Sequence, residues 1–382
     1  MHSRSKIFAG GAALAATALS LALVAPANAD GAPTSTDIVG VGSDTVQNIA
    51  NFLADGDPAL SNGINSTVGK NRLISFDATP DANDRAGYLQ NSTFSVAKNL
   101  SPTIILRAAT KPIRRPNGST QGVSALIADG AANNINFARM SRLPKTIEQN
   151  GVTGGLRVIR ISTDDLRLGV VDSTTAPTHA PAALTAAQLA MVYLCDPAFR
   201  TWDQITPGAS TNPILPLIPP SGGTRDTFLA DLSAANGSPV APGTCVVNAE
   251  ENDPAALTGS TVPQDTIAPF SVGRLNLYAS NYFLNPNTAY PAAAPIVSGV
   301  KALNGAGSYL NTRGLYIVFR DSDTTLTTPW QPGGAQNWVT ALFRNPNGTP
   351  YVNSTDGQAA IKAGGATPAY RDCGAGAGVI SC

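Results

Sequence analysis

Four short stretches of this 382-residue chain bring glycine or arginine next to hydroxyl side chains. One of them lies at residues 221–232, where Ser-Gly-Gly-Thr-Arg-Asp precedes apolar residues at helical spacing. The first turn of a helix leaves backbone N–H groups without partners and carries about half a positive charge. Gly222 and Gly223 allow a ligand to approach closely, and Thr224 and Arg225 add a hydroxyl and a guanidinium. The stretch therefore suits an anion, although a solvated turn that Thr224 caps is the alternative.

Three further stretches repeat this chemistry, and two of them also begin a predicted helix. They are Gly42-Ser43-Asp44-Thr45, Asn117-Gly118-Ser119 and Arg139-Met140-Ser141-Arg142. Each stretch alone is weak evidence for a binding site. Ser43, Asp44 and Thr45, for example, could simply cap the helix that follows them. All but the first have arginine alongside, and strands that end in glycine turns bring such ends to one edge of an α/β sheet. We therefore expect the four stretches to form one site.

The elements that must position these stretches alternate between strands and helices. Strands are predicted at residues 38–41, 103–107, 135–138, 157–161, 166–171, 214–218, 267–272 and 314–320, and helices after residues 45, 119 and 223, at 184–193 with Thr185 as N-cap, after Pro254 and at 338–343. Trp202 and Ile205 are predicted core residues, and residues 322–333 and those from Ala363 onward are predicted loops. This alternation predicts an α/β fold.

The amino-terminal residues 1–29 have the pattern of a secretory signal peptide, with Arg4 and Lys6 before an apolar run and Ala27-Asn28-Ala29 before a cleavage point at Asp30. Because no cysteine lies at that point, we expect a released, extracellular protein, and no later apolar run is long enough to span a bilayer. Without this peptide the chain has 23 basic and 25 acidic residues, which favours neither nucleic acid nor an anionic membrane as a partner.

The four cysteines of this exported chain predict two disulfides. Proximity favours Cys195 with Cys245 and Cys373 with Cys382, although three pairings are possible. His179 is the one histidine after the signal peptide, so neither a histidine-based catalytic triad nor a multi-histidine metal centre is readily built. We therefore expect no cofactor, no metal and no catalysis.

These motifs together resemble the phosphate-binding proteins of bacterial ABC importers, which have the type II periplasmic binding protein fold. The resemblance covers most of the chain after the signal peptide and is carried by Gly42-Ser43-Asp44-Thr45, Asn117-Gly118-Ser119, Ala138-Arg139-Met140-Ser141-Arg142, Gly223-Thr224-Arg225 and the segment 184–205. It implies that hydroxyls and amides at helix starts of two domains surround a dehydrated phosphate. Two positions depart from the family pattern. Gly222 stands where a serine is usual, and Arg142 stands where some members carry an aspartate, so the identity of the anion stays open.

The resulting expectation is an α/β protein of two domains with a ligand cleft between them. Domain 1 comprises residues 30–143 and 272–382, domain 2 residues 144–271, and the chain crosses between them near Pro144 and Pro269. The expected ligand-binding residues are Ser43, Asp44, Thr45, Ser119, Ser141, Arg142, Gly223, Thr224 and Arg225. The ligand is inorganic phosphate or a similar oxyanion, the protein is a monomer, and an ABC permease is a candidate partner.

Two other classes of function fit the same scaffold. One is a phosphomonoesterase that uses Ser43 or Thr224 as nucleophile, and the other is a cell-envelope interaction protein whose cleft has lost its ligand. Asp44 also has two candidate roles. Its carboxylate either accepts a hydrogen bond from a protonated phosphate and so disfavours sulfate, or merely caps the helix that follows.

Overall fold

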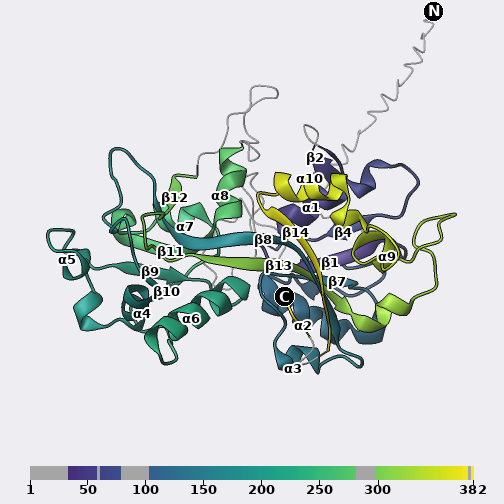
Figure 1. The fold of residues 1–382 in the computed structure, drawn as a ribbon, viewed down its shortest axis with the longest axis horizontal. Coiled ribbons are helices and arrows are strands. Elements are labelled where there is room, and N and C mark those ends of the chain that lie inside the picture. The colour runs from purple at the N-terminus through teal and green to yellow at the C-terminus, as the bar shows by residue number, and fades with distance from the viewer. Residues whose placement is uncertain (1–32, 58–60, 79–102, 281–297, 377–379) are drawn as a thin grey trace, which may run out of the picture.

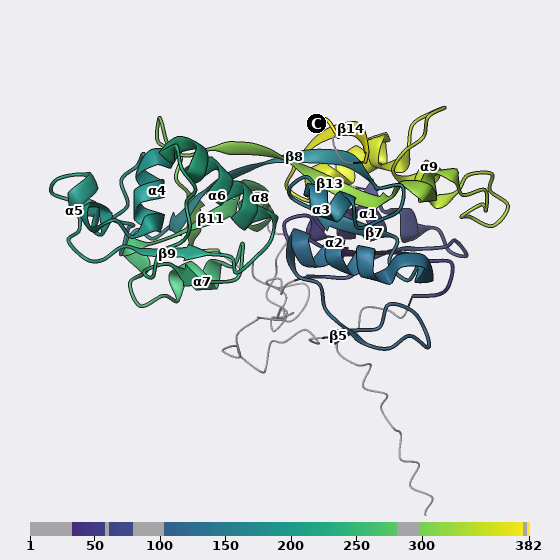
Figure 2. The same ribbon diagram turned by 90° about the horizontal axis from the view of Figure 1, so that it is seen from below.

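The computed structural model describes residues 33–57, 61–78, 103–280, 298–376 and 380–382, so the predicted signal peptide lies outside the described residues. Two lobes lie side by side and are joined by two long strands, β8 (Leu156–Val171) and β13 (Asn311–Arg320) (Figure 1). The same two strands are seen to run from one lobe to the other when the molecule is turned (Figure 2). All but four of the strands join one sheet in the order β10-β9-β11-β8-β13-β7-β1-β4, with β12 and β14 also paired to β8.

The first lobe contains the predicted strand, turn and helix at residues 38–55. Its strands are β1 (Ile38–Gly42), β4 (Leu73–Ser75), β7 (Phe137–Met140) and β14 (Thr367–Ala375), with the two-residue strands β2 (Gly56–Asp57), β3 (Ser61–Asn62), β5 (Thr103–Ile104) and β6 (Ile113–Arg114). Its helices are α1 (Gln47–Asp55), α2 (Gly118–Asp129), α3 (Thr146–Gln149), α9 (Trp338–Leu342) and α10 (Thr355–Ala363). Strand β1 pairs in parallel with both β4 and β7, as expected of an α/β sheet.

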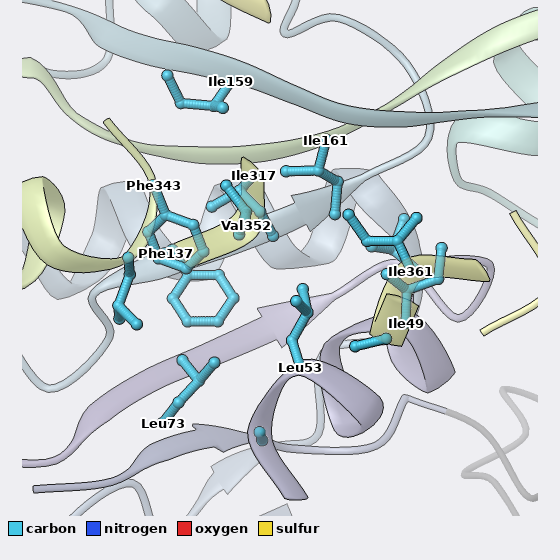
Figure 3. Close-up of a cluster of buried hydrophobic side chains, with 14 of the residues drawn as sticks. Ile49, Leu53, Leu73, Phe137, Ile159, Ile161, Ile317, Phe343, Val352 and Ile361 are labelled. Atoms are coloured by element: carbon cyan, nitrogen blue, oxygen red, sulfur yellow. The ribbon is translucent and has the colours of Figure 1, made fainter. Parts of the chain in front are cut away.

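Both faces of this sheet are covered by apolar side chains, because residues alternate between the faces along each strand. On one face, Ile317 and Phe319 of β13 pack with residues of α1, α9 and α10, including Leu53 and Ile361 (Figure 3). On the other face, Val318 of the same strand packs with residues of α2. This burial holds the starts of α1 and α2 at the end of the sheet that faces the second lobe.

The second lobe has its own core beside the other half of β8. Its strands are β9 (Leu215–Ile218), β10 (Val247–Asn248), β11 (Thr266–Ser271) and β12 (Val300–Ala302), and its helices are α4 (Ala186–Leu194), α5 (Trp202–Ile205), α6 (Gly223–Asn236), α7 (Pro254–Thr258) and α8 (Val272–Ala279). The hydroxyl of Thr185 accepts a hydrogen bond from the backbone of Gln188, so the predicted N-cap of α4 is confirmed. Trp202 is fully buried, as predicted, and Ile205 is partly buried.

Both predicted disulfides are present, Cys195–Cys245 in the second lobe and Cys373–Cys382 beside β14. Cys195 has a left-handed backbone at the end of α4, and Cys245 lies 50 residues further along the chain. Among the described residues, no helix combines the length and apolar character that a membrane span requires.

The chain passes between the lobes along β8 and β13, whereas the sequence placed the crossings near Pro144 and Pro269. The first half of β8 pairs with β14, and the second half pairs with β11 and β12. Leu303 and Tyr309 pack into the core of the second lobe. We therefore propose that the second domain extends to the start of β13; the division into residues 30–143, 144–271 and 272–382 stays a prediction.

Four elements differ from the sequence-based prediction. The strands predicted at residues 157–161 and 166–171 are one strand of 16 residues, because the polar residues between them continue the pairing with β13. The strand predicted at 103–107 is only two residues long. The prediction of loops from Ala363 onward was wrong, because β14 lies half-exposed along β8 and shows no apolar alternation. Residues Asp321–Thr325 form a short helical turn in the predicted loop at 322–333.

Candidate functional site

The starts of helices α2 and α6 meet between the lobes. Gly118 begins α2 and Gly222 precedes α6, and both have positive φ values, of 87° and 116°. A Cβ atom on Gly118 would lie 3.3 Å from the Cα atom of Gly222, and one on Gly223 would collide with the hydroxyls of Ser119 and Ser141. The backbone conformation therefore favours glycine at Gly118 and Gly222, and the close approach of the serine hydroxyls requires it at Gly223.

The predicted hydroxyls of the first lobe lie at this junction. The Ser119 hydroxyl oxygen accepts a hydrogen bond from the backbone N–H of Ser141 at 3.0 Å and lies 3.3 Å from the Ser141 hydroxyl. The backbone N–H of Ser43 donates to the carbonyl of Arg139 at 3.0 Å, which fixes the turn between β1 and α1. The Ser43 hydroxyl is fully buried and has no hydrogen-bond partner within the described residues.

An arginine that the sequence analysis missed connects the hydroxyls of the two lobes. Arg313 of β13 donates to the Thr224 hydroxyl at 2.7 Å and to the Thr45 hydroxyl at 3.4 Å. It also forms an ion pair with Asp164 at 3.2 Å, and the two residues are directly paired positions of β13 and β8. Both side chains are almost fully buried. Arg313 therefore places a positive charge where the chain crosses between the lobes.

The segment Glu250 to Asn252 of the second lobe reaches across to the first and was also missed. The Thr45 hydroxyl donates to Glu251 at 3.2 Å, and the side-chain amide of Asn252 donates to Asp44 at 3.1 Å. The side-chain amide of Asn117 donates to Glu250 at 2.9 Å. The backbone N–H of Ser271 donates to the side-chain oxygen of Asn252 at 2.8 Å. This bond orients the side-chain amide of Asn252 toward the first lobe. These contacts make the acidic segment part of the junction between the lobes.

Burial shifts the pKa values of Glu250, Glu251 and Asp164 toward their protonated forms. Burial raises the pKa of Glu251 well above its ordinary value, and the neighbouring Asp44 carboxylate adds to the effect against the attraction of Arg313. Burial likewise raises the pKa of Glu250 to about 8, although the hydrogen bond from Asn117 opposes the shift. Burial also raises the pKa of Asp164, against the attraction of Arg313. Burial therefore favours the protonated forms of Glu250 and Glu251 at the junction.

Two predicted ligand-binding arginines point elsewhere. Arg225 donates to the carbonyl of Pro219 at 2.9 Å, within its own lobe. Arg142 forms ion pairs with Glu148 and with Asp226 of α6, both at 2.7 Å. Arg142 thus ties the first lobe to the second. Direct binding of an anion by either residue stays a prediction.

The other predicted residues are brought together. They are Ser43, Asp44, Thr45, Ser119, Ser141, Gly223 and Thr224, and their side chains or Cα atoms are buried at the junction. Helix α1 begins after Val46, whose side chain offers no cap, and the Asp44 carboxylate accepts hydrogen bonds from Asn252 of the other lobe. Asp44 therefore links the lobes, and its role in selecting an anion stays a prediction.

One cavity between the described parts of the two lobes is small. A residual cavity of about 10 Å³ is lined by Asn117, Pro219, Pro220, Ser221, Glu250 and Glu251. This is room for about one water molecule, since a water needs ~10–15 Å³ of such volume. The side-chain amide of Gln121 also donates to the Ser221 hydroxyl at 2.7 Å across the gap. A tetrahedral oxyanion thus enters only if the lobes separate or the Glu251 side chain moves.

Solved structures are similar to this chain at low sequence identity. A putative phosphate ABC transporter substrate-binding protein from Clostridium perfringens, with bound phosphate, is 14% identical with a TM-score of 0.50, over 87% of this chain and 99% of that chain. An ABC-type phosphate transport receptor from Vibrio cholerae is 15% identical with a TM-score of 0.41, over 76% of this chain and 89% of that chain. No family model and no curated protein matches the chain. The first likeness confirms the predicted fold, a two-domain α/β fold of the type II periplasmic binding protein kind.

Proposed function

We propose that this chain is a solute-binding protein that captures phosphate or a phosphate-like oxyanion between its lobes. The observation that carries the proposal is the position of the Arg313 guanidinium, which donates to hydroxyls of both lobes, Thr45 and Thr224, beside the converging starts of α2 and α6. Guanidinium, hydroxyl and helix-start N–H groups are the donors that oxyanions bind in proteins. The weak charge of the whole chain agrees with this local design, since the donors rather than a broad positive surface would attract the anion.

The two connecting strands supply the motion that such binding requires. β8 and β13 pair with each other over their full shared length. Both strands pass from one lobe to the other at the level of Asp164 and Arg313. A bend of both strands at that level would separate Thr224 and Glu251 from the first lobe and expose the donors. We propose that an oxyanion binds to the opened cleft and takes the contacts of Glu251 with Thr45 when the lobes close again.

The proposed setting is extracellular, in line with the predicted signal peptide, and the protein is proposed to act as a monomer. Both solved structures described above are named as parts of phosphate transport systems, which favours delivery to an ABC permease here as well. The alternative of a phosphomonoesterase needs a base near Ser43 or Thr224. His179, its natural candidate, lies in the second lobe with its Nδ1 atom 2.9 Å from Asp265, next to Gln264. No observation at the junction favours hydrolysis.

Calorimetric titration of the purified protein, stripped of bound anion by partial unfolding and dialysis, tests the proposal. Phosphate is expected to bind with one site per chain, and Arg313→Ala is expected to weaken that binding. The matched control is Arg371→Ala, which removes an exposed arginine from the edge strand β14. Absence of binding by the wild-type protein to phosphate, arsenate and sulfate would refute the proposed function.

A further inference from the structure

A pair of carboxyl groups joins the two lobes. Asp44 lies in the turn between β1 and α1 of the first lobe, and Glu251 lies between β10 and α7 of the second. Both are buried, with 0% and 5% of their surface exposed, and the Thr45 hydroxyl lies within hydrogen-bond distance of both, at 3.4 Å from Asp44 and 3.2 Å from Glu251. This hydroxyl has a single proton to donate, and two buried carboxylates beside it would repel each other, so the arrangement favours a proton on one of the two carboxyl groups.

Arg313 does not neutralise the negative charge of the pair in place of a proton. Arg313 faces Glu251 from β13, but its guanidinium is engaged by Asp164 and by the hydroxyls of Thr45 and Thr224. Further charged groups face the pair from other elements. They are Glu250 in the same segment, Asp253 before α7, and Arg274 of α8, which acts on Glu250 and Asp253. One oxygen of Glu251 is buried beside Gly222 with no partner in the described part of the chain.

We infer that Asp44 and Glu251 form a proton-dependent latch, which holds the lobes closed while the pair shares a proton and releases them when that proton is lost. The latch regulates the cleft of the proposed function and rests on it for the identity of the ligand. The closed junction itself depends only on the chain. Asn252 and Thr45 support the latch, since each contacts a carboxyl group of the opposite lobe.

The sign of the pH effect follows from where the proton binds more tightly. In the closed form burial and the Asp44 charge raise the pKa of Glu251, whereas in the open form Glu251 meets water and titrates near the ordinary pKa of about 4.3. The closed form therefore holds more protons above that pH. The closing equilibrium constant falls about tenfold for each further pH unit, until the closed form also loses its proton. Glu250, with a pKa of about 8 in the closed form, makes the fall steeper.

Small-angle X-ray scattering in anion-free buffer between pH 5 and pH 9 tests the latch with the full chain after the signal peptide. The wild-type radius of gyration is expected to increase with pH as the lobes separate. Glu251→Gln keeps a hydrogen-bond donor without titrating, so its radius is expected to increase less with pH than that of the wild type, and the remaining increase is attributed to Glu250. Asp44→Asn removes the same carboxyl pair from the side of the first lobe. It replaces Glu251→Gln in the experiment if circular dichroism shows that Glu251→Gln does not fold.

The matched control is Asp323→Asn. Burial raises the pKa of Asp323 to about 6, but this residue pairs with Arg320 inside the first lobe. Its variant is expected to open with pH as the wild type does. A wild-type radius that does not change between pH 5 and pH 9, or an equal increase in Glu251→Gln, would overturn the latch. Because no ligand is present, this outcome is independent of the phosphate titration that tests the proposed function.

Discussion

Replacement of Arg313 by alanine is the most informative change to the cleft. It removes the donor to Thr45 and Thr224 and leaves Asp164 buried without its ion-pair partner. Loss of one partner of a buried, hydrogen-bonded charge pair lowers binding by about 2–5 kcal/mol. Each 1.4 kcal/mol is a tenfold change in the dissociation constant, so phosphate affinity should fall about 30-fold or more. The same change should lower the free energy of unfolding by about 3–5 kcal/mol, because Asp164 is left unpaired.

Calorimetry separates these effects if it is run well below the melting temperature of each variant. Arg313→Lys keeps the charge but not the two-pronged geometry, so it should bind phosphate more weakly than wild type and more strongly than the alanine variant. Arg225→Ala tests the assignment made from the sequence, since Arg225 donates to Pro219 and not into the junction. If Arg225→Ala weakened phosphate binding as much as Arg313→Ala, the central role given to Arg313 would be refuted.

Three further predictions concern the selectivity for phosphate over sulfate, the Cys195–Cys245 disulfide and the ionisation of Asp323. Asp44→Asn should weaken phosphate binding and improve sulfate binding, which competition titrations would show; an unchanged ratio would remove Asp44 from selection. Joint replacement of Cys195 and Cys245 by serine should lower the free energy of unfolding in urea by about 4 kcal/mol, since the bridge spans 50 residues. Asp323→Asn should stabilise the protein above pH 6 by about 2–3 kcal/mol but not below pH 4. Burial raises the pKa of Asp323 to about 6, so the stability that its protonated form supports is lost as the pH rises through that value. Equal melting temperatures of the wild type and Asp323→Asn at pH 8 would contradict this.

The parts of the site that the sequence predicted are those with a local signal. Glycines before apolar residues at helical spacing marked the starts of α2 and α6, and both helices begin there. The turn at residues 42–45 was visible for the same reason. Such signals depend on residues only a few positions apart, and the fold changes them little.

No local sequence pattern marked Arg313 as a residue of the site. Arg313 stands just before the apolar run of β13, where a charged residue looks like the end of a buried strand. Its function arises from the pairing of β13 with β8, which sets it against Asp164, 149 residues away in sequence. The polar residues from Ser162 to Asp165 likewise seemed to separate two strands. They are polar because this part of β8 crosses between the lobes, where apolar packing on both faces is interrupted.

The count of charges at the junction limits which ligand fits. The carboxyl groups of Asp164 and Glu251 lie near the Arg313 guanidinium, and that of Asp44 acts on Glu251. With a proton on Glu251 this set has a net charge of about −1, and an added divalent anion would face that negative charge in a buried setting where repulsion is strong. A ligand that carries a proton can donate it to the Asp44 carboxylate in a hydrogen bond. Sulfate has no proton to offer near neutral pH. The cleft should therefore prefer a protonated oxyanion, because the ligand's own proton removes the repulsion that a fully deprotonated anion would meet at Asp44.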